Sequence, residues 1–254
     1  MSAEEVAACV ERFVGVLFLE LMCTLEDGGR VPVRLEEFLS VTERSAVCVG
    51  HVDRPPLVPM RRLYPRGQRT PTPIVLKFGD PRRLSREAKA LDRMERCKVP
   101  RVPRKVLAGT CSVGAFTLHV LGLTFFEGPS LANFGVLTTE MAHLLRKTVK
   151  AVHGCGLVHR DIKPDNILIA RGSVPFLIDF DCAGDIGETG FRGTSSWASP
   201  SALRGLGAHP NDDFYSLDRI PVLAIRHAQA FSTTATATAT PPTPPKQSIH
   251  VEYT

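Results

Sequence analysis

Residues 157–169 read Leu157-Val158-His159-Arg160-Asp161-Ile162-Lys163-Pro164-Asp165-Asn166-Ile167-Leu168-Ile169, and residues 176–181 read Phe176-Leu177-Ile178-Asp179-Phe180-Asp181. Apolar runs in both parts suit β-strands, and a glycine at position 172 marks the turn between them. A hairpin of this kind predicts that the two aspartates and the asparagine meet at one end. Carboxylate and amide oxygens are ligands that Mg²⁺ prefers in proteins. A surface hairpin with a solvated loop is the simpler alternative, but this ordered set favours a metal and phosphate site.

The series His-Arg-Asp-Ile-Lys-Pro-Asp-Asn, followed by Asp-Phe-Asp, resembles the catalytic loop and metal-binding triplet of eukaryotic-type protein kinases. The resemblance implies that Asp161 orients or deprotonates the substrate hydroxyl and that Lys163 steadies the γ-phosphate of ATP. It implies that Asn166 and Asp179 hold Mg²⁺. A lysine at position 163 resembles the pattern of the serine/threonine-specific branch of the family rather than that of the tyrosine-specific branch. Asp181 replaces the usual glycine of the triplet. Because glycine moves freely through positive φ and aspartate does not, this turn is expected to be less flexible than in the family.

One lysine, Lys77, lies inside the apolar strand predicted over 73–78, where burial without an anionic partner costs free energy. This strand resembles the kinase strand whose lysine contacts the α- and β-phosphates of ATP. The helix predicted over 85–97 offers Glu87 as the ion-pair partner. Glu95 is the second choice, and an ordinary solvated glutamate is the alternative.

Residues 123–131 resemble the connection between the two kinase lobes. The resemblance implies that Leu123 lies at the back of the adenine pocket and that backbone groups of Thr124 and Phe126 bind the base. An apolar strand followed by Gly-Pro is common, so the position of this segment between the lysine strand and the catalytic loop is what supports the assignment.

Residues 193–200 resemble an activation segment, with Ser199 in place of the family's alanine and Ser201 in place of its glutamate. Thr194 is then expected to hydrogen-bond the catalytic aspartate and lysine. Asp213 resembles the helix residue that braces the backbone of the catalytic loop.

Two departures from the family bear on activity. No glycine-rich phosphate loop is present, since the corresponding turn at 41–45 lacks glycine and brings fewer amides close to phosphates. Pro221 interrupts the last predicted helix, and 233–245 is a Thr-Ala and Pro low-complexity run. The late helices of the large lobe are therefore expected to be missing.

The expected fold class is α+β: a two-lobed kinase-like fold with a small antiparallel β-rich N-lobe and a mainly helical, truncated C-lobe. Helical spacing of apolar residues predicts helices over 1–26 and 139–153, and the pattern over 31–52 predicts short strands. The predicted domains are an N-terminal helical extension, the N-lobe, the C-lobe and a disordered tail, at 1–28, 29–126, 127–225 and 226–254.

Composition indicates the expected cellular location and the partners of the chain. Seven cysteines occur singly without a Cys-x-x-Cys pair, which favours reduced thiols over disulfides or a zinc site. The start of the chain lacks a basic secretory signal, and no apolar run is long enough for a bilayer, so the expected location is the cytosol or nucleus. Residues 54–105 carry sixteen Lys or Arg against four Asp or Glu, a charge that suits an acidic partner, whereas no nucleic-acid motif accompanies it.

These features predict a divergent serine/threonine protein kinase that uses ATP and Mg²⁺ on a protein substrate. Its oligomeric state is not predicted. The first alternative is a pseudokinase that binds nucleotide or a partner without catalysis. A small-molecule phosphotransferase is disfavoured by Arg160 and Lys163, and a marginally folded interaction fragment is the remaining alternative.

Overall fold

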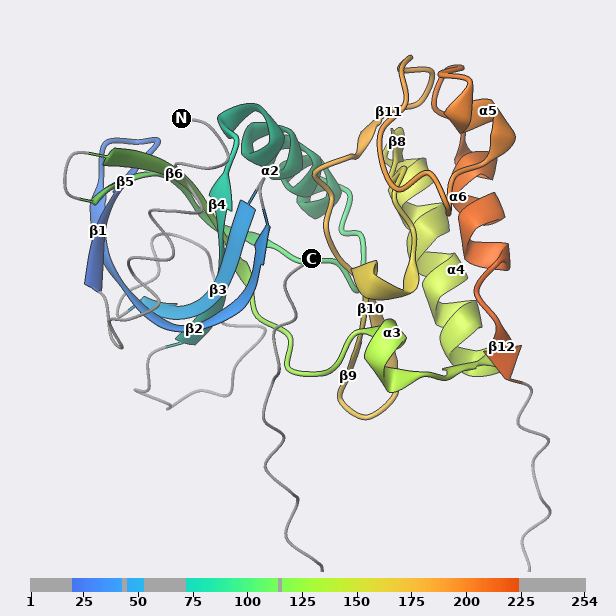
Figure 1. The fold of residues 1–254 in the computed structure, drawn as a ribbon, viewed down its shortest axis with the longest axis horizontal. Coiled ribbons are helices and arrows are strands. Elements are labelled where there is room, and N and C mark those ends of the chain that lie inside the picture. The colour runs from blue at the N-terminus through green and yellow to red at the C-terminus, as the bar shows by residue number, and fades with distance from the viewer. Residues whose placement is uncertain (1–19, 43–44, 53–71, 114–115, 224–254) are drawn as a thin grey trace, which may run out of the picture. The chain divides into compact units, whose positions relative to one another are not determined.

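The computed structural model describes residues 20–42, 45–52, 72–113 and 116–223. Six antiparallel strands close into a barrel (Figure 1). In spatial order they are β1 (Glu20–Leu25), β2 (Arg30–Thr42), β3 (Ser45–Val52), β4 (Thr72–Gly79), β6 (Phe116–Thr124) and β5 (Lys105–Val113). The short strands predicted over 31–52 are instead two long ones, because β2 stays paired with β3 across two register shifts.

Side-chain alternation along β4 explains where Lys77 points. Ile74, Leu76 and Phe78 are buried inside the barrel, where they join its hydrophobic cluster. Since successive strand residues face opposite sides, Val75 and Lys77 lie on the outer face. Val75 packs against a second apolar cluster, so the lysine emerges beside that cluster.

The helix predicted over 1–26 is wrong at 20–25, where the chain forms β1. Leu21 and Cys23 are buried whereas Met22 is 42% exposed, which is the period-two pattern of a strand. Pairing with β2 on one side and β5 on the other overrides the helical spacing. Residues 1–19 lie outside the described residues.

Helix α2 (Pro81–Arg96) follows β4 and confirms the helix predicted over 85–97, with an earlier start. The Asp80 carboxylate accepts hydrogen bonds from the backbone N–H groups of Arg82 and Arg83, and proline suits the first turn because it needs no donor there. The buried face of α2 contains Glu87 among apolar residues.

The second lobe is mainly helical, with short strands between the helices. Its elements are α3 (Leu131–Phe134), β7 (Leu137–Thr138), α4 (Thr139–Gly154), β8 (Leu157–Val158), the 3₁₀ turn η2 (Pro164–Asn166), β9 (Ile167–Ala170), β10 (Val174–Leu177), β11 (Gly184–Asp185), α5 (Pro200–Leu203), α6 (Pro210–Asp218) and β12 (Val222–Leu223). Strands β9 and β10 form the predicted hairpin, with Gly172 at a φ of 80° in its turn.

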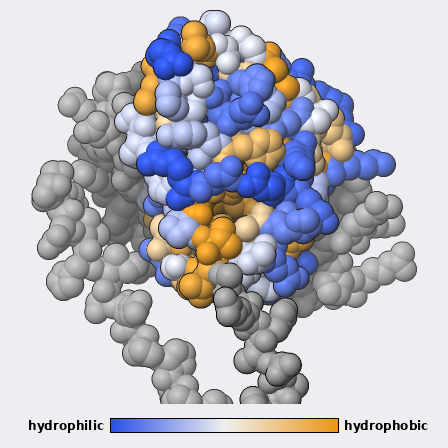
Figure 2. Space-filling model, turned by 90° about the vertical axis from the view of Figure 1, so that its right-hand side faces the viewer, coloured by the Kyte–Doolittle hydropathy of each residue, from blue (hydrophilic) through white to orange (hydrophobic). Residues whose placement is uncertain are grey.

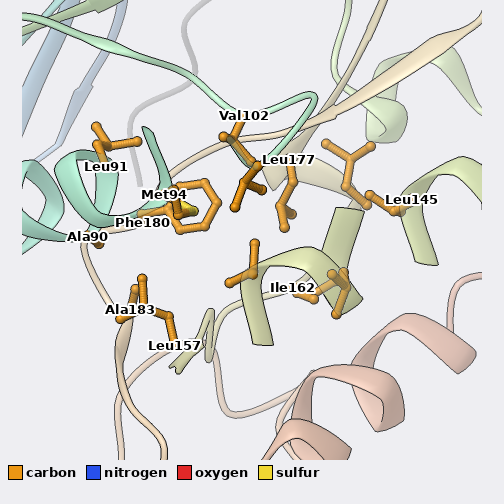
Figure 3. Close-up of a cluster of buried hydrophobic side chains, with 14 of the residues drawn as sticks. Ala90, Leu91, Met94, Val102, Leu145, Leu157, Ile162, Leu177, Phe180 and Ala183 are labelled. Carbon is orange, nitrogen blue, oxygen red and sulfur yellow. The ribbon is translucent and has the colours of Figure 1, made fainter. Parts of the chain in front are cut away.

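Helix α4 confirms the helix predicted over 139–153, and Thr138 caps it by accepting a hydrogen bond from the Met141 N–H. Its apolar face belongs to a cluster that also contains α2, the β9–β10 hairpin and Phe180. Figure 3 shows Phe180 beside Met94 of α2. One continuous apolar cluster therefore connects the lysine-bearing lobe to the lobe that carries the predicted catalytic loop.

The predicted α+β, two-lobed architecture is confirmed. Helix α6 ends at Asp218, before the proline that the sequence analysis identified as a helix breaker. Leu203, Leu206 and Tyr215 are exposed apolar side chains of the second lobe, and Figure 2 shows apolar areas interspersed with hydrophilic ones on the face of this lobe. Of the helices described, none is both long enough and apolar enough to cross a bilayer. The predicted tail at 226–254 lies outside the described residues.

Candidate active site

Lys77 lies between two carboxylates. Its Nζ atom is 2.8 Å from Glu87 Oε1 and 2.9 Å from Oε2, and it is 2.8 Å from Asp179 Oδ1. The Glu87 side chain is fully buried, that of Lys77 is 14% exposed and that of Asp179 is 35% exposed. The ion pair expected between Lys77 and Glu87 is therefore present, whereas Glu95 pairs with Arg104 instead.

Burial and charge act against each other in this triad. Burial lowers the pKa of Lys77, but Glu87 and Asp179 outweigh it and raise that pKa above its ordinary value. Burial raises the pKa of Asp179, but Lys77 outweighs it and lowers that pKa below its ordinary value. Burial also raises the pKa of Glu87, and Lys77 opposes this rise. The ammonium thus remains charged at neutral pH, as binding an anion requires.

Glu87 links the lysine to the segment after the hairpin. Its Oε1 atom also accepts a hydrogen bond from the Phe180 N–H at 3.2 Å. The fully buried Phe180 ring packs edge-on against His159, with centroids 4.6 Å apart. Together these contacts fix Asp179, the residue before Phe180, relative to α2.

Asp181 is also held, although a glycine was expected at its position. Its carboxylate is 3.1 Å from Arg83 Nη1, and its carbonyl accepts a hydrogen bond from Arg86 Nη1 at 3.1 Å. Both arginines belong to α2. Asp181 therefore makes two contacts with α2, one through its side chain and one through its carbonyl. A glycine at this position would make only the second.

The residues of the predicted catalytic loop converge on Asp161, which is buried. Its Oδ2 atom is 3.2 Å from Lys163 Nζ and accepts a hydrogen bond from Asn166 Nδ2 at 3.0 Å. Its Oδ1 atom accepts one from the Thr194 N–H at 2.7 Å, and Lys163 Nζ donates to Thr194 Oγ1 at 2.7 Å. The contacts predicted for Thr194 are thus both present, and a carboxylate with an adjacent ammonium forms a site where a hydroxyl proton can be accepted.

Asp213 of α6 supports this loop from behind. Its carboxylate accepts hydrogen bonds from the N–H groups of His159 and Arg160, both at 2.8 Å, and it contacts His153 Nε2 at 2.8 Å. Arg160 has a φ of 71°, a conformation that a non-glycine residue holds only when its surroundings enforce it. The bracing role predicted for Asp213 corresponds to these contacts.

Asn166 and Asp179 can hold a divalent cation. Asn166 uses its amide nitrogen on the Asp161 carbonyl and carboxylate, which leaves its side-chain oxygen as a ligand. Asp179 has one oxygen on Lys77 and a second available, and its backbone has a φ of 65°. Among the described residues, no group of three or more His, Cys, Asp or Glu is placed to hold a metal ion. Two oxygen donors suit Mg²⁺, which completes its shell with water and phosphate.

Of the residues expected around an adenine, Leu123 and Thr124 lie at the end of β6, the strand next to that of Lys77, and Phe126 follows it. Leu123 of β6 is buried and pairs with Val75 of β4. The Thr124 N–H donates to the Arg104 carbonyl at 3.0 Å, and Phe126 stacks on the ring of Phe176, outside the triad. Their roles in binding a base stay predictions.

One buried polar residue of this region, Asp212, was not predicted from the sequence to have a role. Asp212 precedes Asp213 on α6, is buried, and accepts hydrogen bonds from Ser199 and Ser201. Two consecutive aspartates at a helix start, after a histidine and a proline, indicate capping, and that signal could have identified it.

Comparison with known proteins yields consistent matches. The family model described as "Protein kinase domain" matches residues 135–241. Serine/threonine-protein kinase pkn2 of Myxococcus xanthus is 31% identical over 213 residues, which cover 76% of this chain and 22% of that protein. Serine/threonine-protein kinase PknL of Mycobacterium tuberculosis is 42% identical over 73 residues, or 26% of this chain and 18% of that protein.

A solved structure also resembles the chain. The kinase PK-1 of Cydia pomonella granulovirus superposes with a TM-score of 0.54 at 18% identity, over 73% of this chain and 65% of that one. The chain spans about a fifth of the length of the two bacterial relatives.

Proposed function

Because the chain belongs to the protein kinase superfamily, we propose that it transfers the γ-phosphoryl group of Mg-ATP to serine or threonine hydroxyls of proteins. The observation that carries the proposal is the position of Lys77, 2.8 Å from both Glu87 and Asp179. A buried ammonium of this kind, with oxygen donors close by, is suited to a triphosphate and its metal.

Each site residue has a distinct role in this proposal. Bound Mg-ATP supplies the transferable phosphoryl group and a cation that neutralises its oxygens. Lys77 binds phosphate oxygens, and Asn166 and Asp179 hold the metal. Asp161 accepts the proton of the acceptor hydroxyl, while Lys163 places positive charge beside it.

The serine/threonine preference is supported by two observations. Lys163 contacts both Asp161 and Thr194, so an ammonium occupies the space next to the proposed base. The bacterial relatives are named serine/threonine-protein kinases.

Single cysteines support the cytosol or nucleus as the location. An acidic partner for residues 54–105 is part of the proposal, and 53–71 lie outside the described residues.

A pseudokinase is the second candidate, and the β2–β3 hairpin favours it. Pairing continues to Thr42 and Ser45, and the two residues between them in the sequence, Glu43 and Arg44, which lie outside the described residues, include no glycine. A connection without glycine is expected to bring few backbone amides close to phosphates.

Phosphotransfer to a generic protein acceptor separates the candidates. Wild-type protein with Mg-ATP should label serine or threonine, and Asp161→Asn should reduce the rate by about 10²–10⁴-fold, since a positioned base contributes that factor. Equal incorporation by both proteins, or none by wild type that binds Mg-ATP, would reject catalysis and favour the pseudokinase.

A further inference from the structure

Two neighbouring aspartates on α6 bind two different loops. Asp213 accepts hydrogen bonds from the catalytic-loop backbone, as described above. Asp212 points to the segment that follows Thr194: its Oδ1 atom accepts hydrogen bonds from Ser199 Oγ and, at 2.7 Å, from Ser201 Oγ. One short helix therefore sets the positions of both the catalytic loop and this segment.

Both members of the Asp212–Ser199 pair also accept hydrogen bonds from backbone N–H groups. The Asp212 Oδ2 atom accepts a hydrogen bond from the His209 N–H at 2.9 Å, and Ser199 Oγ accepts one from the Ala202 N–H at 3.0 Å. Asp212 and Ser199 are both buried. Burial raises the pKa of Asp212, but the hydrogen bonds from Ser199 and Ser201 outweigh it and keep that pKa below its ordinary value. The acceptor is thus a carboxylate, and hydrogen bonds to a charged acceptor are stronger than neutral ones.

Other side chains near α6 hold the same segment. Ser216 Oγ donates to the Trp197 carbonyl at 2.9 Å, and Arg219 Nη1 donates to the Ser196 carbonyl at 2.6 Å. The Arg219 guanidinium also lies 5.6 Å from the centroid of the Trp197 ring. With Thr194 bound to Asp161 at one end, the segment is fixed at both ends.

We propose that Asp212, with Ser199 and Ser201, is a positioning group that locks the 194–201 segment onto α6 and so sets how an acceptor protein meets Asp161. The inference rests on the proposed function for its effect on turnover, while the lock itself is a property of the fold. Ser201 occupies the position where the family resemblance predicts a glutamate, so this chain carries hydroxyl donors and a helix carboxylate in its place.

The test uses Ser199→Ala/Ser201→Ala, which removes both hydroxyl donors, and with them the Ser199 cap of α5, but keeps the Asp212 contact with the His209 N–H. It also uses Asp212→Asn, which keeps the Ser199 cap of α5. Asp218→Asn is the matched control, because Asp218 lies on the same helix and its side chain is 56% exposed. Losing charge-assisted hydrogen bonds should lower kcat/KM for an acceptor peptide by about tenfold or more. KM for ATP should stay within about twofold of wild type, since the lock does not contact the Lys77 triad.

Hydrogen exchange supplies a readout that does not depend on activity. The 194–203 peptides should exchange faster in both test variants and at the wild-type rate in the control. Unchanged exchange would overturn the lock. Its positioning role would be overturned if KM for ATP changed as much as kcat/KM for the acceptor peptide, or if the variants of an active enzyme kept the wild-type kcat/KM for that peptide. If wild-type protein transfers no phosphate, the proposed function and the positioning role both fail, and the exchange data still decide whether the lock exists.

Discussion

Replacing Lys77 by methionine tests the electrostatics of the site through stability. The change leaves the fully buried Glu87 without the ammonium that makes two hydrogen bonds to it, so that only the Phe180 N–H remains. Removing one partner of a buried pair costs about 3–5 kcal/mol, because the other charge stays desolvated. Asp179 adds little to this cost, since it is about a third exposed and water can solvate it.

Urea and thermal unfolding measure the expected loss. For a domain of this size, about 2–4 °C per kcal/mol converts the cost into a decrease in Tm of roughly 6–20 °C. The second variant, Lys77→Met/Glu87→Gln, removes the stranded charge and should recover a large part of the stability. If Lys77→Met is as stable as wild type, or the double variant is no better than the single one, the buried-pair reasoning is wrong.

The same two variants differ in their pH dependence. Without Lys77, burial acts unopposed by the ammonium and keeps the pKa of Glu87 above its ordinary value of 4.5. The folded state then binds more protons than the unfolded state, so stability falls as pH rises through the folded pKa. The stability gap between the single and double variants should therefore narrow as the pH is lowered toward 4.5. A gap that is constant with pH would contradict the assignment to Glu87.

Thiol reactivity, barrel closure and loop support provide further tests. Burial raises the pKa of Cys182 to about 12, so iodoacetamide at pH 8 should label the exposed Cys97 and spare Cys182; equal labelling in mass spectra would contradict this packing. Gly109→Ala places a Cβ 2.0 Å from a main-chain oxygen of β1 and should cost about 1–3 kcal/mol or more in urea unfolding, whereas Gly154→Ala, with open space around it, should be neutral or stabilising. Asp213→Ala leaves two buried N–H groups unpaired and should cost about 2–6 kcal/mol, so an unchanged urea midpoint would refute its bracing role.

Local chemistry made the core of the site predictable. A lysine within an apolar strand requires an anionic partner, and a glutamate on the buried face of the next helix is well placed to supply it. The hairpin brought Asn166 and Asp179 toward the loop of Asp161, as the turn at Gly172 indicated. These inferences depended on the spacing of residues within one strand, helix or hairpin, which can be read directly from the sequence.

Long-range pairing was not predictable in the same way. Residues 20–25 fit helical spacing, yet β1 forms because β2 and β5 each offer a strand edge. The residues of β5 that pair with β1 are 84 to 88 positions further along the chain, from the pair Leu25–Gly109 to the pair Cys23–Cys111. The contacts of Asp212 with Ser199 and of Asp181 with Arg83 likewise join segments that sequence spacing does not place side by side.

Binding of Mg-ATP, followed by thermal unfolding of wild-type protein and Asp179→Asn, tests the central claim that Lys77, Asn166 and Asp179 form one nucleotide site. At about 100 times Kd, wild type should gain about 2.7 kcal/mol, or roughly 5–11 °C in Tm, and this gain should require Mg²⁺. Asp179→Asn should lose the Mg²⁺-dependent part of the gain. An unchanged wild-type Tm, or the same Mg²⁺-dependent gain in both proteins, would contradict the claim.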